Sequence, residues 1–388
     1  MAEELAFVLI NPYTISKSRT GGVIARYVGR TDLTLVGARM FGPSQELVTE
    51  FAELMRQTDQ EELENTNLIA DYILKNYAPH PATGKPRRVM LLLFEGENAV
   101  GKIWHVTGSA TLKSGSGETV RDTYGDYILD DNEQVKYCEP AVLVAPSKAK
   151  AADVLKLWAR HSDADGGVIE NAFDVPAIDA EDETLVVLKP DNFRFPSSRP
   201  GNIIDLLSSA NLRIIGVKKF GMSVDQAEEF YGPVKNIFRT KFRALAEGKA
   251  VQALSREFGY DIPADTVSKI GESLANLYAD AQFGTIIKFM TGKTPAECPV
   301  DQRSKPGSEV CIGLVYAGQG AVAKIRQLLG STDPNQARPG SVRKEYGSNV
   351  LVNAAHASDS PENVKREMGI IKMREDNLAE LVEKHYGL

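Results

Sequence analysis

The sequence predicts an α+β protein made of two βαββαβ units, each an antiparallel sheet with helices on one face. The chain has 388 residues, which is too long for one ordinary hydrophobic core. Two similar apolar stretches, residues 5–10 and 185–189, are each typical of a buried strand that ends at a proline. Residues 234–257 and 266–289 have helical periodicity with few strand signals, so a helical insertion is expected in the second unit.

The chain repeats itself, and the repeat fixes the order of these units. Residues 95–110 align without a gap with residues 317–332, at a constant offset of 222 positions. The opening strands align at an offset of 178 positions, which separates Asn11 from Lys189. The second copy therefore holds 44 more residues than the first, and they fall within 232–306.

We expect the first copy to be a domain of residues 1–162 and the second a domain of residues 183–388, with the insertion at about 233–306. Between the copies, residues 161–183 are acidic and irregular, and Asp, Gly and Pro break any period there. In each copy the coarse order is strand, helix, strand, one or more helices, strand, helix, strand, helix. This order fits a βαββαβ unit.

Composition and charge exclude several classes of protein. The hydrophobic fraction of 43% and the charged fraction of 25% are those of a soluble globular protein. A net charge of -7 argues against a protein that binds nucleic acid or a membrane through its overall field. The three cysteines lie far apart without CxxC spacing, so neither a disulfide framework nor a zinc site is expected. A basic leader and a long apolar run are both missing, which indicates the cytoplasm.

The sequence does not support either of two common nucleotide-binding motifs. Gly318-x-Gly320-x-x-Ala323 follows an apolar strand and opens a helix, as a dinucleotide-binding turn does, but no acidic residue ends a second strand roughly 20 residues later. The sequence also has no GxxxxGK[ST] motif, so it lacks a P-loop.

His356 stands out among the five histidines because of its surroundings, although a lone histidine is more often a surface or structural residue. Residues 350–361 predict a strand that runs into small residues and then a helix start. Ser360 is expected as the N-cap and Pro361 as the first helical residue. Small neighbours leave room for a bulky substrate, and the amides at the helix start favour an anion.

The motif Asn353-x-x-His356-x-Ser358-Asp359 resembles the active-site signature of the nucleoside diphosphate kinase family. The resemblance extends over residues 183–371 apart from the insertion, and it implies two ferredoxin-like domains. Further matching motifs are Lys189-Pro190-Asp191, Ala227-Glu228-x-Phe230-Tyr231, Lys324-Ile325-Arg326, Gly330-Ser331-Thr332-Asp333-Pro334 and Pro339-Gly340-Ser341-Val342-Arg343.

The resemblance implies a ping-pong reaction through phosphohistidine, in which His356 takes the γ-phosphoryl group of a nucleoside triphosphate and passes it to a nucleoside diphosphate. Such chemistry needs a nucleophile in line and cations that neutralise the spreading charge. Imidazole suits the first role because much of it is unprotonated at neutral pH. Magnesium is expected to arrive with the nucleotide, held by phosphate oxygens and water.

The same resemblance implies the supporting roles. Its phosphate-binding residues are Lys189, Arg326, Arg343, Thr332 and Tyr231. Asn353 and Lys189 would hold the ribose hydroxyls, and Glu367, backed by Ser358, would orient the imidazole. The usual glycine after the histidine is Ala357 in this sequence. The insertion begins where the family places an aromatic residue against the base, so Phe238 and Val350 are candidates for that contact.

The first copy lacks most of this constellation. Lys189, Arg326 and Thr332 align with Asn11, Trp104 and Ala110, whereas Arg343 aligns with a retained Arg121. No histidine occurs in residues 139–147, where the counterpart of His356 falls. The first copy is therefore predicted to be degenerate and to serve packing or regulation.

Two other functions remain open at this point. One is a non-catalytic nucleotide-binding or scaffold protein, and the other is a histidine-dependent phosphotransferase that acts on a protein partner. The intact nucleophile favours a kinase over a mere binder. A homo-oligomer is expected from the resemblance, and the tandem copies can themselves imitate a dimer.

Overall fold

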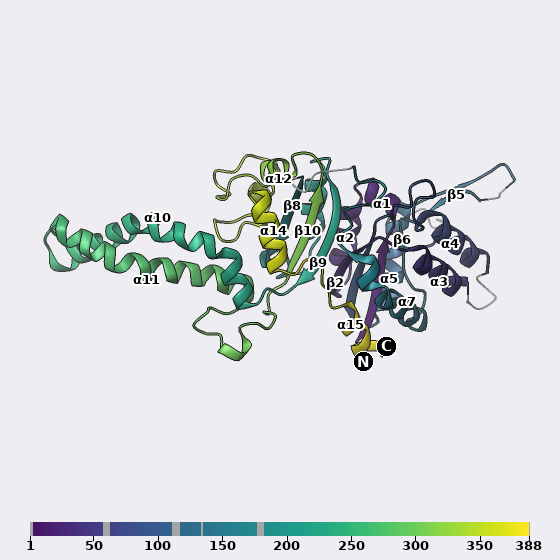
Figure 1. Cartoon of the computed structure of the whole chain (residues 1–388), viewed down its shortest axis with the longest axis horizontal. Helices are drawn as coiled ribbons and strands as arrows, with labels where there is room; N and C mark the ends of the chain where they lie inside the picture. The colour runs from purple at the N-terminus through teal and green to yellow at the C-terminus, as the bar shows by residue number, and fades with distance from the viewer. Residues whose placement is uncertain (1–2, 57–62, 111–116, 133–134, 177–181, 388) are drawn as a thin grey trace. The chain divides into compact units, whose positions relative to one another are not determined.

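The computed structural model describes residues 3–56, 63–110, 117–132, 135–176 and 182–387 (Figure 1). It divides into two compact units. The sheet unit consists of Met1–Phe220 and Ile312–Leu388, and the hairpin unit is Gly221–Cys311. Both sequence copies contribute to the sheet unit, so the expected domain limits at 162 and 183 stay a prediction. No described helix combines the length and the apolar character needed to cross a membrane.

One nine-stranded sheet runs through the sheet unit, in the order β11-β8-β10-β9-β2-β3-β1-β6, with β7 paired to β2. The first copy supplies β1 (Glu4–Ile10), β2 (Thr34–Phe41), β3 (Val89–Gly96) and β6 (Val142–Leu143). The second copy supplies β8 (Glu183–Leu188), β9 (Arg213–Phe220), β10 (Cys311–Ala317) and β11 (Ala355–Ala357). Within each copy the fourth strand lies beside the first, and the third lies between the first and second. The first strand of each copy pairs antiparallel with the third and with the fourth, and β2 pairs antiparallel with β3. This confirms the predicted fold class, with a ferredoxin-like strand order in both copies.

The two copies join edge to edge. Strands β2 and β9 pair antiparallel through Arg39 and Lys218. Beside this junction, helices α2 (Thr20–Arg30) and α9 (Arg199–Ser208) pack on each other. A Cβ atom on Gly201 would lie 2.3 Å from the carbonyl oxygen of Gly21, so glycine is needed for this close approach. The linker also spans the junction, because β7 (Gly166–Gly167) pairs with β2 and Val168 bridges to Gly216.

The crossover helices share one face of the sheet, as predicted, since α2 contacts α5 (Ala99–Thr107) and α9 contacts α12 (Ala321–Leu329). The helices after the last strands, α7 (Lys148–Arg160) and α14 (Pro361–Ile370), contact β1 and β8. Strand β8 is buried on both sides: Val186 and Leu188 join the main core cluster, and Leu185 and Val187 are fully buried outside it. The remaining elements of this unit are α1 (Pro12–Ser16), α3 (Gln45–Arg56), α4 (Leu63–Asn76), α6 (Val120–Tyr124), β4 (Asp126–Leu129), β5 (Val135–Glu139), α8 (Ser162–Asp165), η2 (Pro190–Asn192), α13 (Val342–Tyr346) and α15 (Leu378–Tyr386).

The hairpin unit consists mainly of two long helices that pack on each other, α10 (Val224–Phe258) and α11 (Ala264–Thr291), followed by η3 (Val300–Gln302) (Figure 1). Both predicted helices are present and longer than their periodic patterns. Helix α10 begins at a capping box on Ser223 and ends at Gly259 in the left-handed conformation. It runs through Pro233 without ending. The first copy has the helices α3 and α4 at the same place in its chain order, so the insertion lengthens a helical segment that both copies possess.

Candidate functional site

His356 lies at the edge of the sheet, on the three-residue strand β11. It faces Val187 of β8 across an antiparallel pair, whereas its neighbours Ala355 and Ala357 pair with the residues on either side of Val187. Because successive strand residues point to opposite faces, both alanines turn into the main core and the imidazole turns to the other face. The strand is shorter than the sequence predicted, since residues 350–354 form irregular turns instead.

The helix start after β11 is as predicted. The Ser360 hydroxyl accepts a hydrogen bond of 3.2 Å from the amide of Asn363, and Pro361 is the first residue of α14. This cap fixes where the helix begins, so it also fixes which helical residue faces the imidazole. That residue is Glu367, two turns into α14.

Glu367 and Ser358 hold the imidazole in place. The Nε2 atom of His356 lies 2.8 Å from Oε2 of Glu367, and the Ser358 hydroxyl donates to the same oxygen at 2.6 Å. An ionised carboxylate only accepts hydrogen bonds, so Nε2 carries the proton in this contact. The His356 side chain is 23% exposed and that of Glu367 only 5%, which leaves the ring within reach of a ligand while its partner is buried. The expected trio is therefore brought together.

Arg366 is a further member of this group that sequence reasoning missed. Its guanidinium lies 3.3 Å from Oε1 of Glu367, the oxygen that His356 and Ser358 do not contact. The same side chain donates to Asn363 at 3.0 Å. No motif signals such a role, because a residue next to Glu367 in sequence ordinarily points away from it on a helix.

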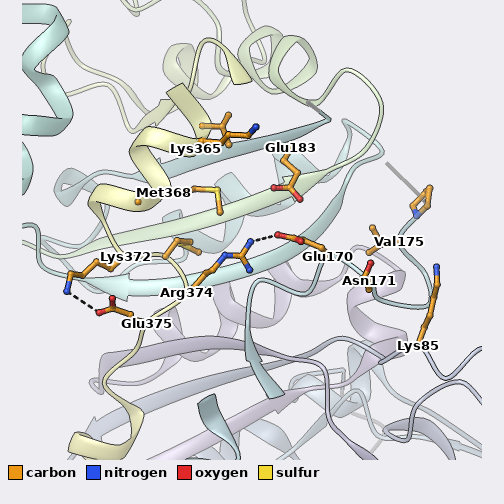
Figure 2. A pocket seen from close by; sticks show the side chains of 14 residues that line it. Lys85, Glu170, Asn171, Val175, Glu183, Lys365, Met368, Lys372, Arg374 and Glu375 are labelled. Atoms are coloured by element: carbon orange, nitrogen blue, oxygen red, sulfur yellow. Dashed lines mark hydrogen bonds and ion pairs between the residues drawn. The ribbon is translucent and has the colours of Figure 1, made fainter. Parts of the chain in front are cut away.

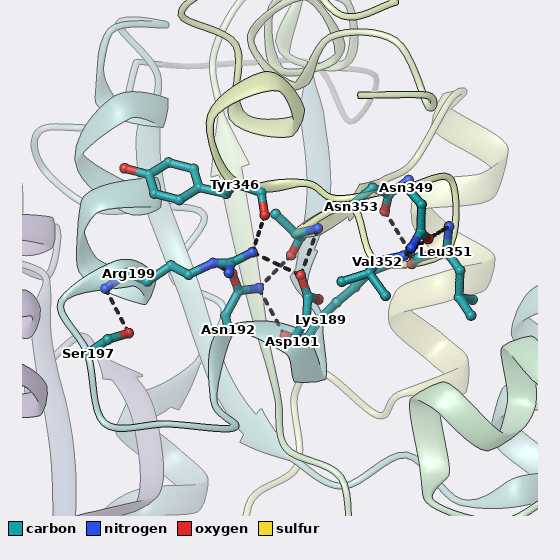
Figure 3. A network of polar contacts seen from close by, with 11 residues as sticks. Lys189, Asp191, Asn192, Ser197, Arg199, Tyr346, Asn349, Leu351, Val352 and Asn353 are labelled. Atoms are coloured by element: carbon teal, nitrogen blue, oxygen red, sulfur yellow. Dashed lines mark hydrogen bonds and ion pairs between the residues drawn. The ribbon is translucent and has the colours of Figure 1, made fainter. Parts of the chain in front are cut away.

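Lys189 and Asn353 form a second buried pair (Figure 3). The Lys189 ammonium donates to Oδ1 of Asn353 at 2.7 Å and to the carbonyl of Leu351 at 3.1 Å. The Asn353 amide donates in turn to the carbonyls of Thr332 and Val350, at 3.0 Å and 2.9 Å. Lys189, Asn353 and Thr332, all expected at the site, thus meet at one place. Thr332 takes part through its backbone carbonyl, and the residue is exposed.

A third network supports the turn before β11 (Figure 3). Asn192 donates to the Ala354 carbonyl at 2.6 Å, and Asp191 accepts from the Ala354 amide at 3.2 Å. Arg199 donates to Asp191 at 3.0 Å and to the carbonyl of Tyr346. Burial raises the pKa of Asp191, and Arg199 partly offsets this. Ala354 has a φ of 70°, a left-handed conformation that is costly for alanine, so the network holds a strained residue two positions before His356.

Arg343 also reaches the histidine strand. Its guanidinium donates to the carbonyl of Gly330 at 2.9 Å and to that of Ala355 at 3.1 Å. Arg326 lies in the last turn of α12 and is exposed, and α12 contacts β11. Tyr231 is buried in α10 of the hairpin unit. Its place at the site therefore stays a prediction.

The two candidates for the base contact also stay predictions. Phe238 is half-buried in α10 and belongs to the hairpin unit. Val350 is 58% exposed in the turn before β11.

The first copy shows which residues occupy the corresponding positions where the histidine is absent. The strand pair of Leu9 and Leu143 matches that of Val187 and His356, because β1 and β8 are 178 positions apart. The helix caps agree with this register, since Ser147 and Ser360 are separated by the same 213 positions as Leu143 and His356. At this offset the counterparts of His356, Ser358 and Glu367 are Leu143, Ala145 and Val154, all of them buried. Apolar packing has thus taken the place of the polar trio.

Arg121, the retained arginine of the first copy, keeps the contacts of Arg343. It donates to the carbonyls of Gly108 and Val142 at 2.9 Å and 3.2 Å. Both arginines therefore join the end of a crossover helix to the last strand of their copy. An arginine at this position has a structural role whether or not the last strand carries a histidine.

The described residues contain no group of three or more His, Cys, Asp or Glu side chains that could hold a metal ion. None of the three cysteines, all of which lie in the described segments, forms a disulfide.

A pocket of about 660 Å³ lies between α14 and the linker (Figure 2). Lys365 and Met368 of α14 line it, together with Glu170, which is paired with Arg374. Glu183 is also at its wall, and burial raises the pKa of its carboxyl. No predicted site residue lines this pocket.

Comparisons with known proteins find similarity to nucleoside diphosphate kinases. A family model described as nucleoside diphosphate kinase matches residues 304–376. A nucleoside diphosphate kinase of Bdellovibrio bacteriovorus is 29% identical over 189 residues, covering 49% of this chain and 91% of that protein. One from Campylobacter hominis is 28% identical over 186 residues, covering 48% and 91%. A solved structure of the Aquifex aeolicus nucleoside diphosphate kinase aligns with 49% of this chain and 94% of that chain, at 23% identity and a TM-score of 0.30. The segment that this family model matches, residues 304–376, carries His356, Ser358 and Glu367.

Proposed function

We propose that this chain is a nucleoside diphosphate kinase that transfers a γ-phosphoryl group through phospho-His356. One observation carries the proposal: a partly exposed imidazole is fixed by a buried carboxylate at 2.8 Å, inside a segment that matches the kinase family. A residue needed only for packing does not require this polar arrangement. The first copy illustrates the point, since Leu143 fills the same position there.

Nδ1 is the proposed nucleophilic atom. Because Glu367 holds the protonated Nε2, the imidazole is in the tautomer whose lone pair lies on Nδ1. That lone pair forms the bond to the γ-phosphorus of the donor, and the bond from phosphorus to the β,γ-bridging oxygen breaks. The nucleoside diphosphate leaves with the electron pair of that bond. The ring becomes more positive in this step, and the Glu367 carboxylate stabilises the new charge.

The proposed phosphate contacts are made by cations and donors around the ring. Arg343 is anchored to the strand of His356, and Arg326 extends from the helix that contacts this strand. Lys189 and Asn353 offer an ammonium and an amide at one place, where ribose hydroxyls and phosphate oxygens can both be bound. Thr332 and Tyr231 complete the set proposed from the resemblance.

Magnesium fits this donor set as a companion of the nucleotide rather than as a resident ion. The carboxylate closest to the nucleophile, Glu367, is engaged by His356, Ser358 and Arg366. Phosphate oxygens and water are the ligands that magnesium prefers, and when bound it neutralises charge on the transferring phosphoryl group. Lys189, Arg326 and Arg343 then hold the phosphate oxygens that remain.

The second half of the reaction reverses the first. An acceptor nucleoside diphosphate occupies the same place, an oxygen of its β-phosphate attacks the phosphorus, and the bond to Nδ1 breaks with its electron pair returned to the ring. Donor and acceptor thus bind in turn, which gives ping-pong kinetics. We place this activity in the cytoplasm, where nucleotides and reduced thiols occur together.

Labelling separates this proposal from its two rivals. The protein is incubated with γ-labelled ATP and magnesium, and GDP is then added. The kinase predicts acid-labile label that is absent from His356→Ala and moves to GDP. Folded wild-type protein that takes up no label would refute the kinase and support a nucleotide-binding scaffold. Label that GDP cannot remove would instead support transfer to a protein partner.

A further inference from the structure

Arg366 makes a contact beside the proposed nucleophile that its place in the sequence does not favour. Its Nη2 atom lies 3.3 Å from Oε1 of Glu367, whereas Oε2 of the same carboxylate lies beside His356 and Ser358. Residues that follow each other in a helix ordinarily point in different directions. The contact therefore requires another group that draws the guanidinium across the helix.

Asn363 holds the guanidinium in this place. Side chains of a helix lean toward its N-terminus, so Arg366 reaches the turn before it. There its Nε donates to Oδ1 of Asn363 at 3.0 Å. The Asn363 amide donates in turn to Oδ1 of Asp359 at 2.7 Å, and this bond decides which end of the amide faces Arg366. A chain of contacts thus runs from Asp359, just before α14, to the Glu367 carboxylate.

The two oxygens of the Glu367 carboxylate have different partners, and this matters for its orientation. A carboxylate turns easily about its last bond, because that torsion has broad minima. Donors at Oε2 alone restrict this rotation less than donors at both oxygens do. The Glu367 side chain is only 5% exposed, and that of Arg366 is 31% exposed. The carboxylate is therefore shielded from water, and donors of the protein set its orientation.

The first copy separates this chain of contacts from the parts of the site that belong to the fold. Arg121 of the first copy keeps both backbone contacts of Arg343, so those contacts form without a histidine. Asp359, Asn363 and Arg366 are not kept. Their counterparts at the offset of 213 positions are Pro146, Lys150 and Asp153. The chain of contacts is thus replaced together with the histidine and its carboxylate, which indicates a role at the imidazole.

We propose that Arg366 is a positioning residue for His356 and acts through Glu367. By binding Oε1 it fixes the carboxylate, so that Oε2 holds the proton on Nε2 and the lone pair on Nδ1 points to the incoming phosphorus. The part that concerns phosphorus rests on the proposed function, whereas the orientation of the ring can be measured on the protein alone. Arginine suits this role because its planar fork binds two partners in fixed directions, while lysine supplies a point charge.

Rapid-quench labelling of the full-length protein with γ-labelled ATP and magnesium measures the effect on the rate. Arg366→Met should slow labelling about tenfold and Arg366→Lys at least about threefold, because lysine keeps the charge but cannot bind both partners. The ATP concentration that gives half-maximal labelling should stay within about twofold of the wild-type value. Lys365→Met is the matched control, since Lys365 is the neighbouring cation of α14, is exposed and lines the pocket of Figure 2. Its labelling rate should equal that of the wild type.

A double-mutant cycle shows whether Arg366 acts through Glu367. Adding Arg366→Met to Glu367→Ala should change the labelling rate less than about twofold, since the carboxylate that Arg366 positions is gone. A further loss of about tenfold would overturn the proposal, because it would mean that Arg366 acts on the nucleotide directly. A wild-type rate in Arg366→Lys would also overturn it, because charge alone would then suffice.

Nitrogen NMR of the histidine side chains keeps the positioning role separate from the kinase activity. At about pH 9, where histidine side chains are ordinarily neutral, His356 of the wild type should carry its proton on Nε2. In Arg366→Met the form with the proton on Nδ1 should become detectable, whereas Lys365→Met should resemble the wild type. Wild-type protein that takes up no label but shows this difference would refute the kinase and support the positioning role. An unchanged tautomer in Arg366→Met would overturn that role.

Discussion

Removal of the Glu367 carboxylate is the most informative perturbation of the proposed site. In Glu367→Ala, the fully buried Ser358 hydroxyl and the Nε2–H of His356 both lose the oxygen to which they donate. In Glu367→Gln, the shape is kept and an amide oxygen can still accept from Nε2, but the negative charge is gone. The two variants therefore separate the charge of Glu367 from its position.

The contacts set the expected size of each effect. Each hydrogen bond to a charged group contributes about 1.5–3 kcal/mol, and a buried donor left without a partner costs about 1–3 kcal/mol. We expect Glu367→Ala to lower the free energy of unfolding by about 2–3 kcal/mol. The rate of histidine phosphorylation should fall about one hundredfold in Glu367→Ala and about tenfold in Glu367→Gln, since each 1.36 kcal/mol changes a rate tenfold.

Rapid-quench labelling with γ-labelled ATP measures that rate directly, and urea denaturation measures the free energy of unfolding. Glu362→Gln is the matched control, because Glu362 is on the same helix and outside the hydrogen bonds around His356. The labelled ring nitrogen should be Nδ1 in the wild type, which phosphorus NMR of the denatured protein can identify. A wild-type rate in Glu367→Ala, or label on Nε2 of the wild type, would refute the reasoning.

Three further predictions concern the frame of the site. Ala354→Gly should raise the free energy of unfolding by up to about 1 kcal/mol, because glycine adopts a φ of 70° without strain, while Ala355→Gly in the adjacent strand should lower it by a similar amount. Gly201→Ala should cost about 3 kcal/mol in thermal or urea unfolding, since its Cβ would meet backbone at 2.3 Å, whereas Gly248→Ala, with open space and a helical position, should gain about 0.5–1 kcal/mol. Burial lowers the pKa of Lys218 from 10.5 to about 8, so between these pH values the folded state binds fewer protons than the unfolded state and the free energy of unfolding rises with pH. Lys218→Met should lack that rise in a series of urea denaturation curves at different pH values. An equal rise in both proteins would contradict the prediction.

The sequence was most informative where one local signal determined the structure. Helical periodicity located both helices of the hairpin unit, and a Ser-Pro pair located the start of α14 within one residue. Once this helix start and the preceding strand are known, the separation of eleven positions between His356 and Glu367 leaves little freedom for the carboxylate. The grouping of His356, Ser358 and Glu367 could therefore be predicted from the sequence, although the hydrogen-bond distances between them could not.

Features that depend on tertiary packing gave no such signal. The edge-to-edge junction of the copies depends on one strand pair and on the glycine contact between α2 and α9, and neither has a periodic pattern. The expected strand from residue 350 was shortened to Ala355–Ala357, because the amides of Leu351 and Val352 are bound by Asn349 in a turn. The role of Arg366 depends on how α14 lies against the strand, which sequence spacing does not reveal.

The two copies also show which parts of the site belong to the fold and which to the chemistry. Arg121 and Arg343 make the same two backbone contacts, and Ala141 and Ala354 have the same left-handed conformation, with φ values of 61° and 70°. These features persist in a copy that has no histidine, so they are required by the last strand of the unit. Several side chains that would touch phosphate or imidazole differ between the copies, among them Lys189 and His356, which correspond to Asn11 and Leu143. A strained turn before the last strand is therefore no evidence of catalysis in this fold, whereas a buried carboxylate that faces the strand is.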